Sequence, residues 1–90
     1  MMNYLHYEFD LDSGDAVEIT LDKQANVRLM DDTNYTNYRQ GLKHHYFGGY
    51  AKESPLTIPA PRAGHWHVVI DLGGYGGTIR AAARVLQGAQ

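Results

Sequence analysis

The clearest pattern of hydrophobic and polar positions runs from residue 64 to residue 72. Large apolar side chains recur there at every second position, which places them on one face of an extended strand. These residues are Trp66, Val68, Ile70 and Leu72. His65 and His67 fall on the opposite face, which we expect to be exposed. A glycine-rich loop over residues 73–77 follows, and a second run begins at Thr78, so the pattern predicts two antiparallel strands joined as a hairpin.

Shorter alternating runs predict further strands over residues 5–9, 17–21 and 27–30, and the run that begins at Thr78 continues to residue 86. Polar turn residues separate the first three runs, and no long amphipathic helix lies between them, which favours antiparallel pairing. A short run over residues 56–58 lies between Pro55 and Pro59. Because proline cannot donate to a strand ladder, we expect this run at a sheet edge.

The pattern changes between residues 31 and 50. Asp31 to Asn34 are residue types that cap helix N-termini, and Tyr35 and Tyr38 follow at helical spacing, which predicts one or two helical turns. Two glycines then lie between aromatic residues at positions 46–50. This arrangement is typical of a tight turn or of a close approach between backbones.

The sequence therefore predicts a mainly all-β fold, a small antiparallel β-sandwich or flattened barrel of about six strands with one short helical insertion. Residues 1–86 form a single domain and residues 87–90 a frayed tail. The predicted core is Leu5, Phe9, Val17, Ile19, Leu21, Val27, Leu29, Leu56, Ile58, Trp66, Val68, Ile70, Leu72, Ile79 and Val85.

Composition narrows the classes of function. The chain has no cysteine, which excludes disulfides, thiolate metal sites and cysteine nucleophiles. Neither a secretory signal nor a membrane-spanning run is evident, so we expect a cytoplasmic protein that does not bind membranes. Residues 1–32 carry eight acidic and two basic side chains, whereas residues 33–90 carry two acidic and six basic ones. The basic residues are scattered rather than clustered, which argues against nucleic acid as a partner.

Several stretches of the chain form a recognisable combination, namely residues 26–31, Tyr35 and Tyr38, Gly41, the turn over residues 46–49 and the segment over residues 64–71. Together they resemble a small bacterial domain family of unknown function, which occurs alone or fused to a TIR (Toll/interleukin-1 receptor) module. The resemblance implies a compact β-rich domain with an accessory or sensing role in signalling or defence. It supplies no catalytic residues.

Two groups of residues offer candidate chemistry. His65 and His67 project from the same strand face and are candidate metal ligands, with His6 or the pair His44 and His45 as possible additions. The alternative is a set of polar pairs at the surface, and no cofactor is expected. The loop over residues 73–77 lacks the lysine and the following helix of a phosphate-binding loop.

The second group mixes aromatic and basic side chains, a combination that binds rings, anions or protein surfaces. Its members are Tyr35, Tyr38, Arg39, Lys43, His45, Tyr46, Tyr50 and Tyr75. Our leading hypothesis is a non-catalytic interaction module that recognises a protein or small ligand through the insertion over residues 33–50. The alternatives are a metal-binding or small hydrolytic enzyme that uses the histidines, and a structural subunit of a homo-oligomer.

Overall fold

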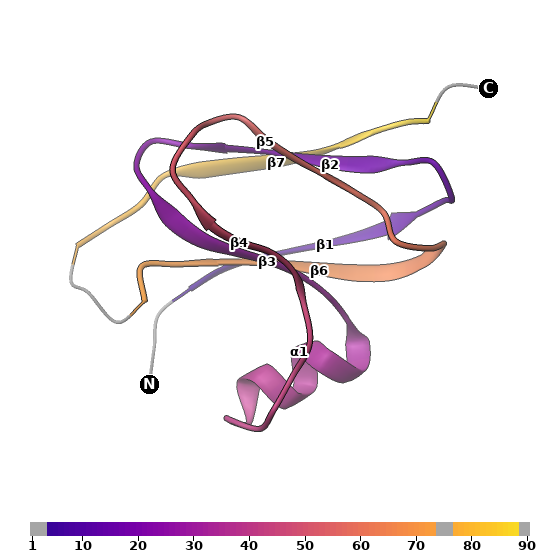
Figure 1. Ribbon diagram of the computed structural model, residues 1–90, viewed down its shortest axis with the longest axis horizontal. Coiled ribbons are helices and arrows are strands. Elements are labelled where there is room, and N and C mark those ends of the chain that lie inside the picture. Colours follow the sequence, from indigo (N-terminus) through magenta and orange to yellow (C-terminus); the bar gives the residue numbers. More distant parts are fainter. Residues whose placement is uncertain (1–3, 74–76, 89–90) are drawn as a thin grey trace.

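Two antiparallel sheets pack face to face, and one short helix covers the outer face of the larger sheet (Figure 1). The structure is a computed structural model that describes residues 4–73 and 77–88. Its strands are β1 (Leu5–Leu11), β2 (Ala16–Leu21), β3 (Ala25–Asp31), β4 (Phe47–Ala51), β5 (Leu56–Pro59), β6 (Gly64–Asp71) and β7 (Ala81–Leu86). The helix is α1 (Asp32–Arg39). The predicted mainly β fold with one short helical insertion is confirmed.

The larger sheet has the strand order β1-β6-β3-β4, and the smaller sheet has the order β5-β2-β7. All neighbouring strands are antiparallel. The two sheets remain separate layers in the described residues, so a sandwich describes them and a closed barrel does not (Figure 1). β5 lies at the edge of the smaller sheet, as its flanking prolines predict.

The core fills the space between the two sheets. Trp66, Val68 and Ile70 from β6 meet side chains from β2 and β3, and all three are buried. Every residue of the predicted core lies in this cluster or packs against it. Small residues at two positions, Ala25 and Ala51, also belong to the core. Their hydrophobicity is too low for the alternating pattern to single them out.

The predicted hairpin between the strands on either side of residues 73–77 is wrong. β6 pairs with β1 and β3 in the larger sheet, whereas β7 pairs with β2 in the smaller one. The segment between them therefore crosses from one sheet to the other (Figure 1). The last strand also begins at Ala81 rather than Thr78. An alternating pattern identifies which face of a strand is buried, but it does not identify the strand that pairs with it.

The segment over residues 31–50 begins with α1 and ends with β4. The Asp31 side chain caps the helix by accepting a hydrogen bond from the backbone amide of Asn34 at 2.9 Å. The paired glycines lie within β4 rather than in a turn. A Cβ atom added to Gly48 would lie 2.4 Å from the carbonyl oxygen of Val27, so the predicted close approach of backbones does occur.

Candidate functional site

The outer face of the larger sheet is polar, and α1 lies against it through contacts with β3 and β6. His67 and Asp71 of β6 point to this face and are only 6% and 1% exposed. The expectation of an exposed face is therefore wrong for these two residues, because the helix supplies a third layer. His65, near the start of the same strand, remains exposed. One strand thus carries an apolar face towards the core and a buried polar face beneath the helix.

A chain of hydrogen bonds crosses this polar face from β1 to α1. The His6 Nε2 atom lies 2.8 Å from His67 Nδ1, and His67 Nε2 lies against the Asp32 carboxylate. On the other side, the Tyr35 hydroxyl lies 3.3 Å from His6 Nδ1 and 3.0 Å from the Tyr4 hydroxyl. The chain joins three segments that are far apart in the sequence, namely the start of β1, helix α1 and strand β6.

The direction of this chain follows from its acidic end. A carboxylate only accepts hydrogen bonds, so His67 donates from Nε2 to Asp32. With one proton on each ring, His67 accepts at Nδ1 from His6 Nε2, and His6 accepts at Nδ1 from the Tyr35 hydroxyl. The hydroxyl of Tyr4 completes this series by donating to Tyr35. Every hydrogen bond of the chain is satisfied in this arrangement.

Tyr35 also covers the two imidazoles with its ring. Its centroid lies 4.3 Å from the ring centroids of both His6 and His67, at interplanar angles of 16° and 10°. The two imidazoles are nearly coplanar with each other, at 14°. Burial raises the pKa of Tyr35 to about 12, so its hydroxyl keeps its proton at neutral pH. Through Tyr35, the helix therefore covers one face of the histidine pair.

The three histidines of this face differ in electrostatics. Burial lowers the pKa of His6, and the neighbouring His67 lowers it further, which keeps His6 neutral at physiological pH. Hydrogen bonds to Glu8 and Asp10, at 2.9 and 2.7 Å, raise the pKa of His65 to about 9. In return, the hydrogen bond from His65 lowers the pKa of Glu8. A charged imidazolium at His65 therefore lies near the neutral imidazole of His6.

A second buried group surrounds Asp71. Its carboxylate accepts hydrogen bonds from the side chains of Asn26 at 3.0 Å and Tyr38 at 3.1 Å, from the Gly73 amide at 2.8 Å and from Arg28. Burial and the adjacent Asp71 raise the pKa of Tyr38 to about 12. Because four donors satisfy the carboxylate, this group ties α1 and β3 to β6 and has no capacity left for a ligand.

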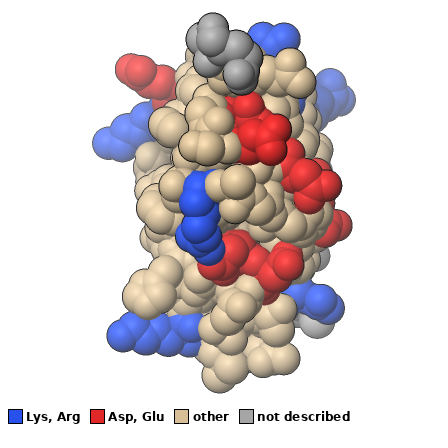
Figure 2. Space-filling view, turned by 90° about the vertical axis from the view of Figure 1, so that its right-hand side faces the viewer, with Lys and Arg blue, Asp and Glu red and all other residues tan. Residues whose placement is uncertain are grey.

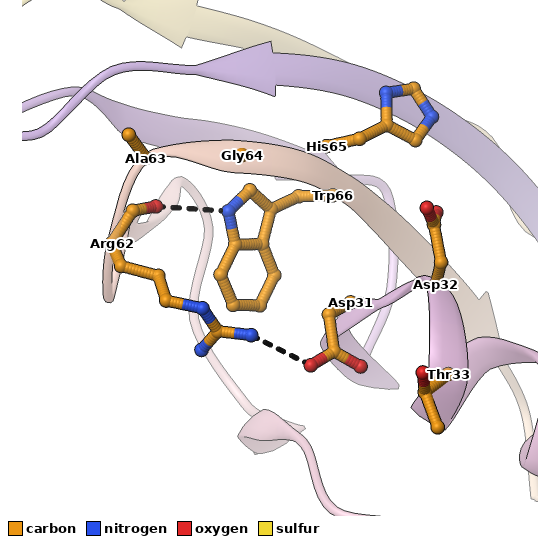
Figure 3. Close-up of a pocket in the computed structure, with 8 residues that line it drawn as sticks. All are labelled: Asp31, Asp32, Thr33, Arg62, Ala63, Gly64, His65 and Trp66. Atoms are coloured by element: carbon orange, nitrogen blue, oxygen red, sulfur yellow. Dashed lines mark hydrogen bonds and ion pairs between the residues drawn. The ribbon is translucent and has the colours of Figure 1, made fainter.

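An open pocket of about 280 Å³ lies where β6 begins and α1 starts (Figure 3). The guanidinium of Arg62 lies 4.9 Å from the Trp66 ring centroid and binds the Asp31 carboxylate at 2.7 Å. The indole Nε1 donates to the Arg62 carbonyl oxygen at 3.0 Å, and Figure 3 shows both interactions on one side of the pocket. Asp32 and His65 lie on its other side (Figure 3).

The structure divides the predicted aromatic and basic group. Tyr35 and Tyr38 are half-buried against the sheet, where their hydroxyls bond to His6 and Asp71. Five members are exposed on the surface, namely Arg39, Lys43, His45, Tyr46 and Tyr50. Tyr75 lies outside the described residues. Two members of the group therefore hold the helix on the polar face, and five are exposed to solvent.

Glu8 and Asp32 belong to the polar face, and sequence reasoning did not assign them to it. Glu8 lies directly opposite His67 in the pairing of β1 with β6. The sequence did contain a signal for this: His6 and Glu8 are two residues apart and project from one face of the first strand, as His65 and His67 do on theirs. It could not be used without knowing that these two strands are neighbours.

The fold and the polar face define a three-layer β-sandwich domain in which a short helix covers a histidine and carboxylate cluster. The chain belongs to the DUF1883 family, a domain of unknown function, whose family model matches residues 2–89. No curated protein and no solved structure matches the chain. Within the described residues, no helix is long and apolar enough to cross a membrane.

Proposed function

We propose that this protein is a non-catalytic interaction module that binds an extended, acidic segment of a partner protein along the free edge of β4. The partner segment would add a strand to the larger sheet, using backbone hydrogen bonds for affinity and side-chain contacts for specificity. The observation that carries the proposal is that β4 lacks the features that protect the other sheet edges.

The described residues contain four edge strands, and three of them carry features that oppose pairing with another chain. β1 presents Glu8 and Asp10, β7 contains Arg84, and β5 follows Pro55 and ends with Pro59. β4, with the sequence Phe-Gly-Gly-Tyr-Ala, contains neither a charged residue nor a proline. An unprotected edge of this kind is a template for an added strand.

The side chains of this edge also favour binding. Phe47 is 49% exposed and Tyr50 is 57% exposed, and Tyr46, which precedes the strand, is 43% exposed. Tyrosine and phenylalanine supply a large contact area with few rotatable bonds, so ordering them on binding costs little entropy. The paired glycines leave the backbone between them accessible to a partner strand.

The charges around β4 indicate the chemistry of the partner. Arg39 and Lys43 lie before the strand and Lys52 follows it, and all three are exposed. Between residues 33 and 53 the one acidic residue is Glu53. Complementary charge speeds association and favours the correct partner, so the bound segment should be acidic.

The test uses two libraries of displayed peptides of about six residues, the length of an average strand. Apolar residues alternate with Asp or Glu in one library and with Lys in the other. We expect enrichment from the acidic library only, and the selected peptides should shift the amide NMR signals of β4. Methylating alternate backbone nitrogens of a selected peptide should abolish binding, because the ladder hydrogen bonds would be lost.

Two variants provide the matched comparison. Tyr50→Lys places a charge on the β4 edge and should weaken peptide binding by about tenfold or more. Thr57→Lys places the same charge on the β5 edge and should leave binding unchanged. Amide shifts centred on another strand, equal effects of the two variants, or self-association of the protein through β4 in light scattering would refute the proposal.

The resemblance to a bacterial family found alone or fused to TIR modules supports a more specific role. We place the binding activity in bacterial signalling or defence, with the domain acting as an accessory or sensing unit for an effector protein. Genes adjacent to the one that encodes this chain should then include an effector, and the effector should contain an acidic segment that binds β4 in the assay above.

A further inference from the structure

The polar residues of β1 and β6 form a separate site, at the opposite edge of the larger sheet from β4. His6 and Glu8 alternate on β1 and therefore share one face. Glu8 lies directly opposite His67 on β6, and His6 lies diagonally across from it. The antiparallel register thus brings two imidazoles and one carboxylate together.

We propose that His6, Glu8 and His67 bind a divalent transition metal ion, for which Zn²⁺ is the natural probe. The ligand atoms would be His6 Nε2, Glu8 Oε1 and His67 Nδ1, and all lie within 4.8 Å of one another. His67 Nδ1 is 2.8 Å from His6 Nε2 and 3.8 Å from Glu8 Oε1. Two imidazoles and one carboxylate form a common ligand set for zinc, with a further position left for water or another ligand.

The second nitrogen of each histidine supports this assignment. Histidines that bind metals usually donate their other ring N–H to a carboxylate or another oxygen, which fixes the ring and its tautomer. His67 Nε2 already bonds to the Asp32 carboxylate. His6 Nδ1 lies 3.3 Å from the Tyr35 hydroxyl. Both outer nitrogens therefore have oxygen partners, while the inner nitrogens point at each other.

Metal binding requires a change of tautomer at His6 and a small movement of the two rings, because nitrogens that bind one Zn²⁺ at about 2.0–2.1 Å in a tetrahedral site lie further apart than 2.8 Å. In the metal-free protein His6 holds its proton on Nε2 and donates it to His67. When the ion occupies the space between these nitrogens, the proton resides on Nδ1 of His6 instead and is donated to the Tyr35 oxygen. Tyr35 then donates to Tyr4, which reverses one hydrogen bond. No buried group loses its partner in this exchange.

The charges around the ligand set suit a cation. Figure 2 shows acidic side chains gathered in a band over one face of the molecule, and Asp32 and Asp10 beside the cluster add further negative charge.

A second triad, Asp32, His65 and His67, is also compact enough to hold an ion. Both ring nitrogens of His65 already bond to carboxylates, Nε2 to Glu8 at 2.9 Å and Nδ1 to Asp10 at 2.7 Å, so neither is free for an ion. This triad would also remove Asp32 from its position behind His67. The set of His6, Glu8 and His67 is therefore the better site.

The test is a calorimetric titration of Zn²⁺ into the protein at neutral pH. We expect one ion per chain, and the variants His6→Gln and Glu8→Gln should weaken binding by about 100-fold or more. Asp32→Asn should weaken it by about 10- to 100-fold through the second nitrogen of His67. The visible spectrum of the Co²⁺ form should change in each of these variants.

His45→Gln is the matched control, because His45 is exposed and lies outside the cluster. This variant should retain wild-type affinity. Circular dichroism should confirm that the His6 and Glu8 variants, which alter half-exposed or exposed positions on an edge strand, remain folded. Failure of the wild-type protein to bind Zn²⁺, or equal losses in His45→Gln and His6→Gln, would overturn the proposal.

Discussion

Two histidines two residues apart on one strand have opposite environments. His67 is buried within the hydrogen-bonded chain, whereas His65 is exposed between two carboxylates. The alternating pattern correctly placed both on the same face. It could not separate them, because the difference arises from Asp32 and Tyr35 on the helix, which cover only one of the two.

The pH dependence of stability should report on His65. The pKa of His65 is raised to about 9 in the folded protein from an ordinary value of 6.5. Its contribution to stability is therefore complete below pH 6.5, provided that Glu8 and Asp10 are ionised, and is lost as the pH rises through 9. Wild type should be more stable than His65→Gln at pH 6, and the difference should shrink by pH 10.

Urea denaturation of both proteins across this range measures the effect, and NMR titration of the His65 ring should give the raised pKa directly. A constant difference in stability between pH 6 and pH 10 would show that the two ion pairs contribute nothing.

At the scale of elements, the sequence predicted the features that depend on local residue types better than it predicted which strands pair. The helix followed from the capping residue type at Asp31, and the edge position of β5 followed from Pro55 and Pro59. The strand β4 was not predicted as a strand, since two of its five residues are glycines, which disfavour strands. It forms because the glycines allow β4 to pack closely against β3.

Gly48 should therefore be far less tolerant of substitution than Gly41. Gly48→Ala would place a Cβ atom 2.4 Å from the Val27 oxygen at a φ of +119°, whereas Gly41 has a φ of +72° and no atom within 4 Å of the added Cβ. Gly41→Ala should cost about 1 kcal/mol of unfolding free energy for its left-handed backbone alone.

Gly48→Ala adds a steric clash to the backbone strain, so it should cost about 3 kcal/mol or more. Chemical denaturation of the two variants gives both values. Equal costs would mean that β4 can move away from β3 without loss, and the close packing would then not be a determinant of the strand.

At the scale of the molecule, elements of different stability are expected. β6 is paired on both sides and buried on both faces, whereas α1 contains no buried residue and β4 lies at an edge. Local opening exposes amides with few buried contacts first. Hydrogen exchange measured by NMR should therefore be slowest in β6, and roughly 100-fold faster in α1 and β4.

Similar exchange rates throughout would show that the helix and the sandwich open as one cooperative unit.

The presence of helix α1 as an outer layer was only partly predictable from the sequence. Residues 31–38 indicated a helix, but a polar strand face with two histidines usually predicts exposure to solvent. Only the burial of Asp71 and His67 in the structure reveals that the helix covers this face.

The order of the strands has a consequence for the kinetics of folding. In five of the six connections between consecutive strands the chain passes from one sheet to the other, and the centre of the larger sheet is occupied by β6, late in the sequence. Pairings between such distant segments slow folding towards the millisecond to second range. During synthesis, β1 and β3 must wait for residues 64–71 to emerge, with their apolar faces uncovered and open to aggregation or chaperone binding.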